Sequence, residues 1–431
     1  MEERVVKTDS VVVIDNGGDS LKIGYEGEVH PHTEFSNAVG RMKVRPVDAG
    51  TGADKEYHIG GNITRNDELT LTFPVEYGMV VDWDDMEKVF RHAFVDELRI
   101  ATEANPVLLT EAPLTPRYHR EKMVQLMFEN LEVPALYLLQ SPVAALFANG
   151  DRGFVMSQHT CRTVLPDRPH DGPHDGAWSC GDLCDVSRCR TTGLVMDSGD
   201  GATHFVPVYE GTPLHGGIMR LDLGGRDLTD YFARLVAQRG YPFRFGPLME
   251  RAIMRDMKER MCFCSLDYQH DRARSRMQPS KYERPYELPD KARIDAAAAA
   301  PTLFNVGPER FYVPEAMFSP KKLHIESKGI HKLIRKSILR CDGDIRKELF
   351  ANVILSGGNT MFKWLPERLQ TALDGLDPTG IMRPKVDGRK ERKSSAWIGA
   401  SILAQHSIFR KMITREEYDE TGPSIVDLKC F

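Results

Sequence analysis

Two stretches of the same design, each a β-branched run that leads to an aspartate and a glycine-rich turn, constrain this chain most. The first covers residues 12–22 and has Asp15 at its turn, and the second covers residues 195–204 and has Asp197 there. Valine and isoleucine favour extended backbone, and glycine leaves the N–H groups of a turn bare. The pattern predicts two β-hairpins whose turns each carry a carboxylate beside exposed backbone amides.

Either hairpin alone is explained by an ordinary turn, because Asn-Gly and Ser-Gly are common turn sequences. Two hairpins with an aspartate in the same place indicate two loops that face each other. A polyphosphate fits between such loops on backbone N–H groups, and Mg²⁺, which keeps much of its water shell, is reached by Asp15 and Asp197 through water. The sequence therefore predicts a nucleotide site without a Walker loop.

Composition places the chain among ordinary globular proteins. Its 431 residues predict two or three compact units, and it is 41% hydrophobic and 28% charged with a net charge of −5. No basic field points to nucleic acid as a direct partner. The first residues do not resemble a secretory signal, and no apolar run has the length of a membrane span. We expect a cytoplasmic protein, with the nucleus as the alternative, whose eight cysteines stay reduced.

Apolar spacing predicts alternating helices and strands, and hence an α/β fold. Asp84 or Asp85 is the expected N-cap of the first helix. Residues 37–70 are polar and glycine-rich, which predicts a small exposed subdomain or a mobile loop. The expected elements are helices over 84–98, 120–130, 227–239 and 247–264, a strand over 106–110, and strand, turn and helix over 341–375.

Residues 151–190 have no apolar periodicity, which predicts an insertion. The alanine-rich tract at 295–300 predicts a surface loop or a short helical extension. The segment 153–157 resembles 193–197, which indicates a local duplication or a chance similarity. We expect the insertion to be a surface loop that is disordered or binds a partner. Zinc is the alternative, with ligands spaced loosely for a structural site, from Cys161, His170, His174, Cys180, Cys184 and Cys189.

Beyond the hairpins, the chain resembles the actin family in a series of segments that occur in actin order. They are WDDMEK (83–88), PVLLTEAPL (106–114), VMDSGDG (195–201), LDLGGRDLTDY (221–231), LSGG (355–358), WIG (397–399), GPSIV (422–426) and KCF (429–431). The resemblance covers nearly the whole chain except the insertion and the residues around the alanine tract. It implies the two-lobed α/β fold of actin, hexokinase and the heat-shock chaperone ATPases, with a nucleotide cleft between the lobes and two accessory subdomains.

The resemblance also implies a division of the chain. The first large lobe takes 1–36, 74–150 and 395–431, and a small mobile subdomain takes 37–73. The second large lobe takes 191–223 and 326–394, and the second small subdomain takes 224–325.

Site residues carried over from the family surround ATP or ADP with Mg²⁺. Asp15 and Asp197 hold the water shell of the metal, and Lys22 reaches the phosphates. The phosphate path is lined by Gly17, Gly18, Ser198, Gly199, Asp200 and Gly201. The ribose and base are surrounded by Lys258, Glu259, Gly357, Gly358 and Lys393.

Three departures from the family pattern fall where hydrolysis takes place. Gly18 and Asp19 replace a serine and a glycine, so a hydroxyl donor is lost and a carboxylate stands beside a polyanion. Ser141 takes the position of the glutamine that orients the attacking water, and Gln140 lies one residue earlier. On a helix that shift turns a side chain by about 100°. His204, of the same water-ordering group, is kept, so we expect at most a weak ATPase.

The assembly surfaces are altered too. The mobile loop over 44–51 lacks a methionine, and the loop over 321–325 has lost an aromatic and gained a lysine that is costly to bury unpaired. His406 replaces a leucine beside the partner-binding groove, whose other walls are expected at Ile402, Leu403, Ile408 and Met412.

Three functions follow. The first is an actin-like cytoskeletal protein that binds adenine nucleotide and forms or joins filaments with itself or other actins. The second is a scaffold subunit of a larger complex, in which nucleotide is structural. The third, a phosphotransferase or chaperone ATPase of the same fold, is disfavoured because the ends of the chain follow actin.

Overall fold

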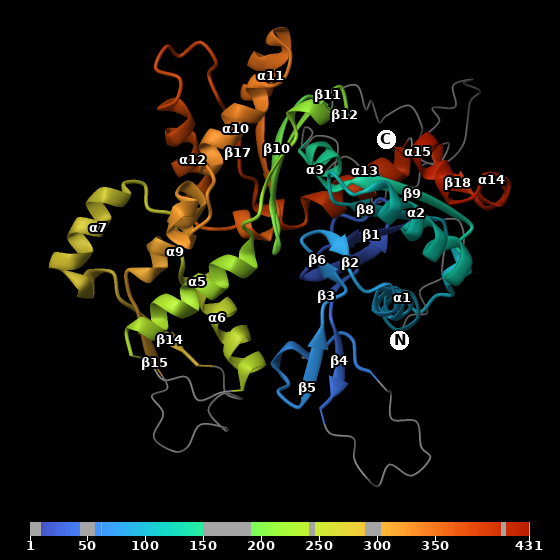
Figure 1. Ribbon diagram of the computed structural model, residues 1–431, viewed down its shortest axis with the longest axis horizontal. Helices are drawn as coiled ribbons and strands as arrows, with labels where there is room; N and C mark the ends of the chain where they lie inside the picture. The colour runs from blue at the N-terminus through green and yellow to red at the C-terminus, as the bar shows by residue number, and fades with distance from the viewer. Residues whose placement is uncertain are drawn as a thin grey trace, which may run out of the picture.

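The computed structural model of the protein describes residues 10–43, 57–61, 63–149, 191–240, 246–288, 303–406 and 411–430 (Figure 1). The insertion at 151–190, its proposed duplication and zinc ligands, the alanine tract and the loop over 44–51 lie outside these residues. Within them, two six-stranded sheets organise the chain. The predicted α/β class is therefore confirmed.

The first sheet is built around the first hairpin. β1 and β2 pair antiparallel, whereas β1, β8 and β9 run parallel. The order across the sheet is β18 (Ile413–Thr414), β9 (Ala135–Gln140), β8 (Val107–Glu111), β1 (Val12–Asn16), β2 (Ser20–Tyr25) and β3 (Thr33–Ser36). Its accompanying helices are α1 (Trp83–Arg91) with η2 (His92–Leu98), α2 (Arg117–Gln125) with η4 (Leu126–Asn130), α3 (Ser141–Ala148), α13 (Ser395–His406), α14 (Arg415–Thr421) and α15 (Val426–Lys429).

The second sheet repeats this plan. β10 and β11 form an antiparallel hairpin, and β10 has the parallel neighbour β16, as β1 has β8. The order is β12 (Thr212–Pro213), β11 (Thr203–Tyr209), β10 (Gly193–Ser198), β16 (Val353–Ser356) and β17 (Val386–Asp387), with β13 (Met219–Leu221) on β11. Nearby in chain order are α10 (Ile330–Leu339), α11 (Arg346–Phe350) and α12 (Leu365–Asp374). Both predicted hairpins are confirmed.

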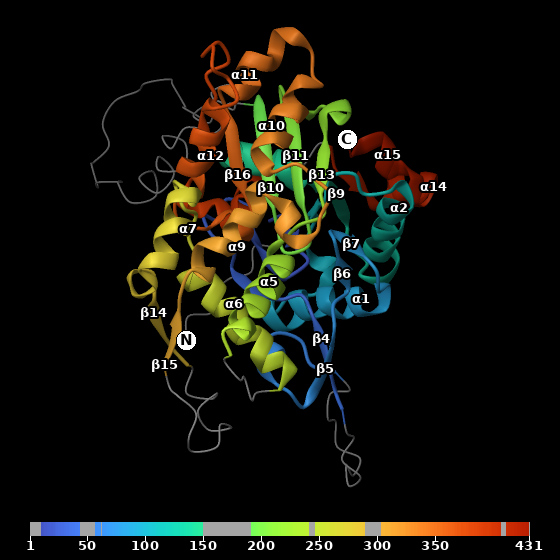
Figure 2. The ribbon, with the colours of Figure 1, turned by 60° about the vertical axis from the view of Figure 1, so that its left-hand side comes forward.

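Two smaller groups of elements extend from the sheets (Figures 1 and 2). One contains η1 (Ile63–Arg65), β4 (Val39–Met42) and β5 (Leu69–Thr72) around a small core of Ala38, Ile63 and Leu69. The other contains α5 (Gly225–Gln238), α6 (Pro247–Met261), α7 (Tyr268–Met277), β14 (Arg284–Glu287), β15 (Leu303–Val306) and α9 (Glu309–Phe318).

Short elements complete the described chain: β6 (Val75–Glu76), β7 (Met79–Val80), η3 (Thr102–Ala104), η6 (His215–Gly217), η7 (Pro279–Lys281), η8 (Pro320–Leu323), η9 (Gly343–Ile345), η10 (Gly358–Thr360), η11 (Lys390–Lys393) and η13 (Pro423–Ile425).

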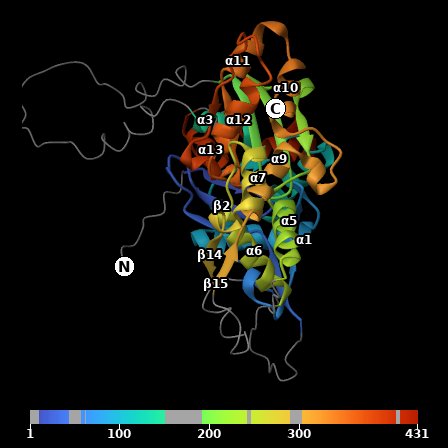
Figure 3. The same ribbon diagram turned by 90° about the vertical axis from the view of Figure 1, so that its left-hand side faces the viewer.

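Helices α3 and α13 pack side by side (Figure 3) and lie between the two sheets (Figure 1). Their backbones approach so closely that a Cβ atom on Gly399 would lie 1.7 Å from the carbonyl oxygen of Ala144. Trp397 of α13 is fully buried and donates its indole N–H to the carbonyl of Val13 in β1, at 3.0 Å. The small residues of α3 and α13 thus allow the helices to pack at the base of both hairpins.

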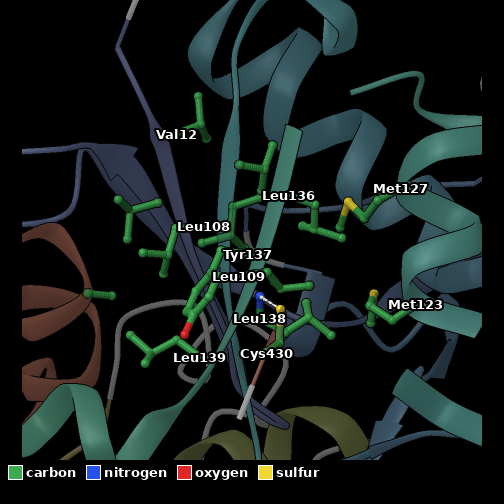
Figure 4. Packing of buried hydrophobic residues seen from close by; sticks show 14 of the residues in the cluster. Val12, Leu108, Leu109, Met123, Met127, Leu136, Tyr137, Leu138, Leu139 and Cys430 are labelled. Carbon is green, nitrogen blue, oxygen red and sulfur yellow. Dashed lines mark hydrogen bonds between the residues drawn. The ribbon is translucent and has the colours of Figure 1, made fainter. Parts of the chain in front are cut away.

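The core of the first sheet is continuous and apolar (Figure 4). Leu108, Leu136 and Met127 pack in it, and the backbone N–H of Leu138 points to the sulfur of Cys430, at 3.4 Å. Cys430 and the other three cysteines within the described residues, Cys262, Cys264 and Cys341, are free thiols. The segment around Cys430 is therefore packed against β9 as part of the hydrophobic core of the first sheet.

The predicted helix over 84–98 exists, but its N-cap is Asp82, which makes the expected Asp84 or Asp85 wrong. The Asp82 side chain accepts a hydrogen bond from the N–H of Asp85, at 2.9 Å. Asp85 is buried instead, where Arg41 and Lys88 bind its carboxylate. The second half of the helix is a π-helix over His92–Leu98, and Arg99 closes it in the left-handed region, at φ 57°.

Candidate nucleotide site

The first hairpin places a buried ion pair at its turn. Asp15 and Lys22 face each other in the β1–β2 register, and Lys22 Nζ donates to Asp15 Oδ2 at 2.9 Å. Thr110, from the neighbouring strand β8, donates to the other carboxylate oxygen at 2.7 Å. Burial lowers the pKa of Lys22, but Asp15 and Glu34 outweigh it, so the pKa is raised overall. Lys22 therefore carries its charge in a nearly dry environment.

The second hairpin places Asp197 at the corresponding position of β10. Burial raises the pKa of this carboxyl to about 6, Ser356 on the neighbouring strand opposes the shift by a hydrogen bond, and the negative charge of Asp15 adds to it. The two aspartates therefore act on each other electrostatically, as expected for carboxylates that face one space. A cation between them relieves this repulsion.

Gly357, directly after β16, packs against the second turn beside Asp197. It adopts φ +89°, and a Cβ atom would lie 2.3 Å from the carbonyl oxygen of Ser198 and 3.0 Å from Asp197 Oδ1. Only glycine fits this approach of β16 to the second turn. Gly201, in the second turn, packs equally closely against the turn between β6 and β7, since a Cβ atom on it would lie 2.9 Å from the Cα of Tyr77. Gly199 has open space around it, and Gly17 and Gly18 lie in the first turn, Gly18 near Val75.

Two predicted phosphate-path side chains are engaged within the protein. The Ser198 hydroxyl is fully buried between Thr203 Oγ1, at 2.7 Å, and Asn359 Nδ2, at 3.0 Å. Asp200 binds Arg226 at 3.1 Å. These contacts hold the turn in shape, so in this structure any phosphate contact from the second loop comes from its backbone.

Asp19 forms an ion pair with Arg255, which lies on α6 opposite the first hairpin. Its two carboxylate oxygens bind the two terminal nitrogens of Arg255 on α6, and Arg255 Nε also binds Glu259, at 2.9 Å. The carboxylate that replaces a glycine of the family is thus neutralised. The ion pair also joins the first hairpin to the second small group of elements.

The predicted ribose and base residues are brought to the same region, although the side chains of three of them bind other protein groups. Lys258 is buried and donates to the carbonyl of Gly225 at 2.8 Å, and burial lowers its pKa. Lys393 binds Glu34 at 3.0 Å. Glu259 is held by Arg255, and Gly358 begins η10 directly after Gly357.

Gln140 and Ser141 do not lie on the same helix. The expectation that a helical turn of about 100° separates their side chains is therefore wrong. Gln140 is the last residue of β9, and Ser141 is the first of α3. The Ser141 hydroxyl donates to the carbonyl of Glu111 at 2.8 Å, so it serves the helix start. Gln140 is buried, and its Oε1 has no hydrogen-bond partner among the residues that the structure describes.

His204 carries a second polar atom of this kind. Its Nε2 is buried without a partner, and burial, with Arg220 adding to it, lowers the pKa of the imidazole to about 4. The ring is therefore neutral at physiological pH. Asn37 and Asn359 also each leave a buried carbonyl oxygen without a partner. Water or a ligand can complete the hydrogen bonding of these four atoms, as it can that of the similar buried atoms of His119, His331 and Arg368 elsewhere in the described part of the chain.

The donor set also fits hydrated Mg²⁺. Asp15 and Asp197 offer oxygen ligands, which Mg²⁺ prefers, and two carboxylates leave most of its water shell in place. Among the residues that the structure describes, no three His, Cys, Asp or Glu side chains gather into a direct metal site.

Sequence reasoning missed several residues of the site. Thr110 lies on β8 and Ser356 on β16, the strands that pair parallel with β1 and β10. The sequence signal for each residue was a polar side chain on the strand next to a hairpin. Glu34 and Asn37 lie on or directly after β3, which pairs with β2 of the first hairpin. Arg255 had no signal, because its partner Asp19 is 236 positions away in the chain.

The assembly surfaces differ from the prediction. Leu403 and Met412 are buried in the core, so they do not line an open groove as expected, and Ile402 is partly buried. Ile408 and the side chain of His406 lie outside the described residues. Lys322 is not unpaired: it donates to the hydroxyl of Tyr268, at 2.6 Å, and lies over that ring. None of the described helices has the length and apolar character to span a membrane.

Comparison with known families agrees with this architecture. A family model described as Actin matches residues 6–431, which is nearly the whole chain. The matched range includes both hairpins, both six-stranded sheets and the two smaller groups of elements. The chain belongs to the actin family.

Proposed function

We propose that this protein binds an adenine nucleotide with Mg²⁺ between its two hairpins and hydrolyses it slowly. The observation that carries the proposal is the arrangement of Asp15 and Asp197 at equivalent positions of two hairpins, with Lys22 bound to Asp15. Asp15 and Asp197 would hold the hydrated metal, which would neutralise the phosphates when bound. The backbone of the two turns and Lys22 would hold the polyphosphate.

Slow hydrolysis is supported by the state of the water-orienting groups. The Ser141 hydroxyl is already hydrogen-bonded to the carbonyl of Glu111. Gln140, the last residue of β9, lies one residue before the position that the water-orienting glutamine takes in the family. Loss of positioning alone slows such reactions by orders of magnitude. Neutral His204 can still accept a hydrogen bond from water at Nε2 or donate one, depending on its tautomer.

Titration calorimetry of the purified protein with ATP, in Mg²⁺ and in EDTA, tests binding. We expect affinity in Mg²⁺ that weakens about tenfold or more in Asp197→Asn, because one of two metal carboxylates is lost. Equal binding by Asp197→Asn and the parent would contradict the site. Single-turnover phosphate release tests hydrolysis, and an actin-like rate would contradict the slow reaction.

Gln140→Ala and Ser141→Ala form a matched pair for the residual hydrolysis. If the free Oε1 of Gln140 orients water, Gln140→Ala abolishes the remaining rate and Ser141→Ala leaves it unchanged. The opposite result would assign that role to Ser141.

We propose further that the protein acts in the cytoplasm as an actin-like filament subunit or joins filaments of other actins. Family membership supports self-association, and the altered loop at 321–325 is compatible with it because Lys322 is paired within the chain. A scaffold subunit of a larger complex is the alternative, favoured by the burial of Leu403 and Met412 where a partner groove was expected. High-speed sedimentation in Mg²⁺-ATP against EDTA separates them, since only a filament subunit pellets.

A further inference from the structure

Helix α10 and its two ends carry a row of basic side chains that the nucleotide site does not use. Lys332, Arg335 and Lys336 belong to the helix, Lys328 comes just before its N-cap Gly329, and Arg340 is its C-cap. Residues four apart lie on one helical face. All five side chains are exposed, and no carboxylate in the described part of the chain forms an ion pair with any of them. In a protein of net charge −5, this is a local concentration of positive charge.

The row borders a hollow of about 350 Å³, which all five basic residues line together with Leu339 and Leu376. A second hollow of about 220 Å³ adjoins it, since Arg335, Leu339 and Leu376 line both. Its remaining wall is mostly apolar and includes Phe350, Leu373, Ile381 and Met382. Ile381 is 60% exposed. The two hollows form one groove, basic on the α10 side and aliphatic on the other.

Internal hydrogen bonds hold the walls of this groove in place. Arg346 donates to the carbonyls of Leu339 and Cys341 at the end of α10, at 3.0 and 2.9 Å. Gln370 of α12 donates to the carbonyl of Pro384 at 2.7 Å. Asp377 accepts from Thr379 and from the N–H of Met382, so the acidic residue in the wall is itself engaged. The groove is therefore built by the fold rather than by a loose loop.

We propose that this α10 groove binds an acidic protein segment that carries aliphatic side chains. The basic row supplies charge complementarity, and Leu376, Ile381 and Met382 offer contact surface to aliphatic groups. A nucleic acid would use the same cations, but it would meet no exposed aromatic ring in the groove on which to stack its bases. The aliphatic wall therefore favours a peptide.

Fluorescence anisotropy of the full chain tests the proposal with a labelled synthetic peptide of Glu-Glu-Leu repeats. We expect saturable binding that the double variant Lys332→Glu, Lys336→Glu weakens about tenfold or more, because two favourable charges become unfavourable. The double variant Arg274→Glu, Arg276→Glu makes the same charge change on exposed positions of α7 and should change binding less than about twofold.

A second pair of measurements isolates the aliphatic wall. Ile381→Asp, at an exposed position, should weaken the same peptide, and a peptide of Glu-Glu-Ser repeats should bind the parent several times more weakly. Equal binding by the α10 and α7 charge variants would overturn the proposal, as would equal binding of the two peptides. Tighter binding of single-stranded DNA than of the Glu-Glu-Leu peptide would assign the groove to nucleic acid instead.

Discussion

Asp19 in the first hairpin and Arg255 on α6, which are 236 positions apart in the chain, form a bidentate ion pair. The pair lies at the edge of the candidate nucleotide site and is partly exposed, with 28% of the Asp19 side chain and 42% of the Arg255 side chain accessible. Water screens such a pair, so we expect it to contribute about 1 kcal/mol to stability. Its larger effect is on the charge that an incoming polyphosphate meets.

Replacement of Asp19 by Asn should therefore tighten ATP binding, because a carboxylate beside the polyphosphate is removed and Arg255 is freed. Arg255→Gln should weaken ATP binding, because Asp19 is then left without its cation. Calorimetric titration with Mg²⁺-ATP measures both. Arg251→Gln is the control, since Arg251 lies one turn earlier on α6 and forms an ion pair with the exposed Asp230, at 3.6 Å. Effects of the same sign in both Asp19→Asn and Arg255→Gln would refute the charge argument.

His204 should make the nucleotide-free protein sensitive to acid. Its pKa is about 4 in the folded protein, against about 6.5 in an unfolded chain. Between these values the unfolded state binds more protons, so stability falls as the pH drops from about 6.5 towards 4, by a total on the order of 3 kcal/mol. Urea unfolding at pH 7 and pH 4.5 should show a smaller loss in His204→Gln than in the parent.

The exposed His215 provides the control for this measurement, because His215→Gln should keep the acid sensitivity of the parent. Asp197 and His331 also titrate in this range, so the comparison between variants, and not the parent curve alone, isolates His204. The same pH dependence in His204→Gln and His215→Gln would mean that other groups are responsible.

Metal binding should weaken in acid through Asp197. With a pKa of about 6, its carboxyl is largely protonated below that pH, and a protonated carboxyl does not hold the water shell of Mg²⁺. We expect the Mg²⁺ dependence of nucleotide affinity to decline as the pH falls from 7 to 5. Asp197→Asn should show weak binding without this decline, whereas Asp230→Asn, on the exposed face of α5, should behave as the parent. A flat profile in the parent would argue against Asp197 as a metal residue.

Gly357 should be the glycine least tolerant of substitution in the site. Alanine there requires a strained backbone at φ +89° and places Cβ 2.3 Å from the carbonyl oxygen of Ser198. We expect Gly357→Ala to destabilise the protein by about 3 kcal/mol or more, because the opposing atom belongs to the backbone of β10 and cannot move freely. Gly343→Ala, with open space around it, should stay within about 0.5 kcal/mol. Thermal unfolding of the two variants under identical conditions tests the difference.

The sequence by itself determined what depends on local pattern. The β-branched runs and glycine turns predicted both hairpins. The register of the first hairpin then set Asp15 opposite Lys22, and the register of the second set Asp197 opposite His204. Apolar spacing also predicted the helices that became α1, α2, α5 and α6, with ends displaced by a few residues. These features follow from neighbours in the chain, which a sequence states directly.

Only the tertiary structure decided which distant groups meet. Whether Asp19 faced solvent or a cation depended on α6 packing opposite the first hairpin, and nothing near Asp19 in the chain encodes Arg255. The burial of Leu403 and Met412 depended on how the end of the chain packs against the first sheet. Apolar character in the sequence is the same for a core residue and for a groove residue, because the hydrophobic effect has no direction; the surrounding elements decide which one it becomes.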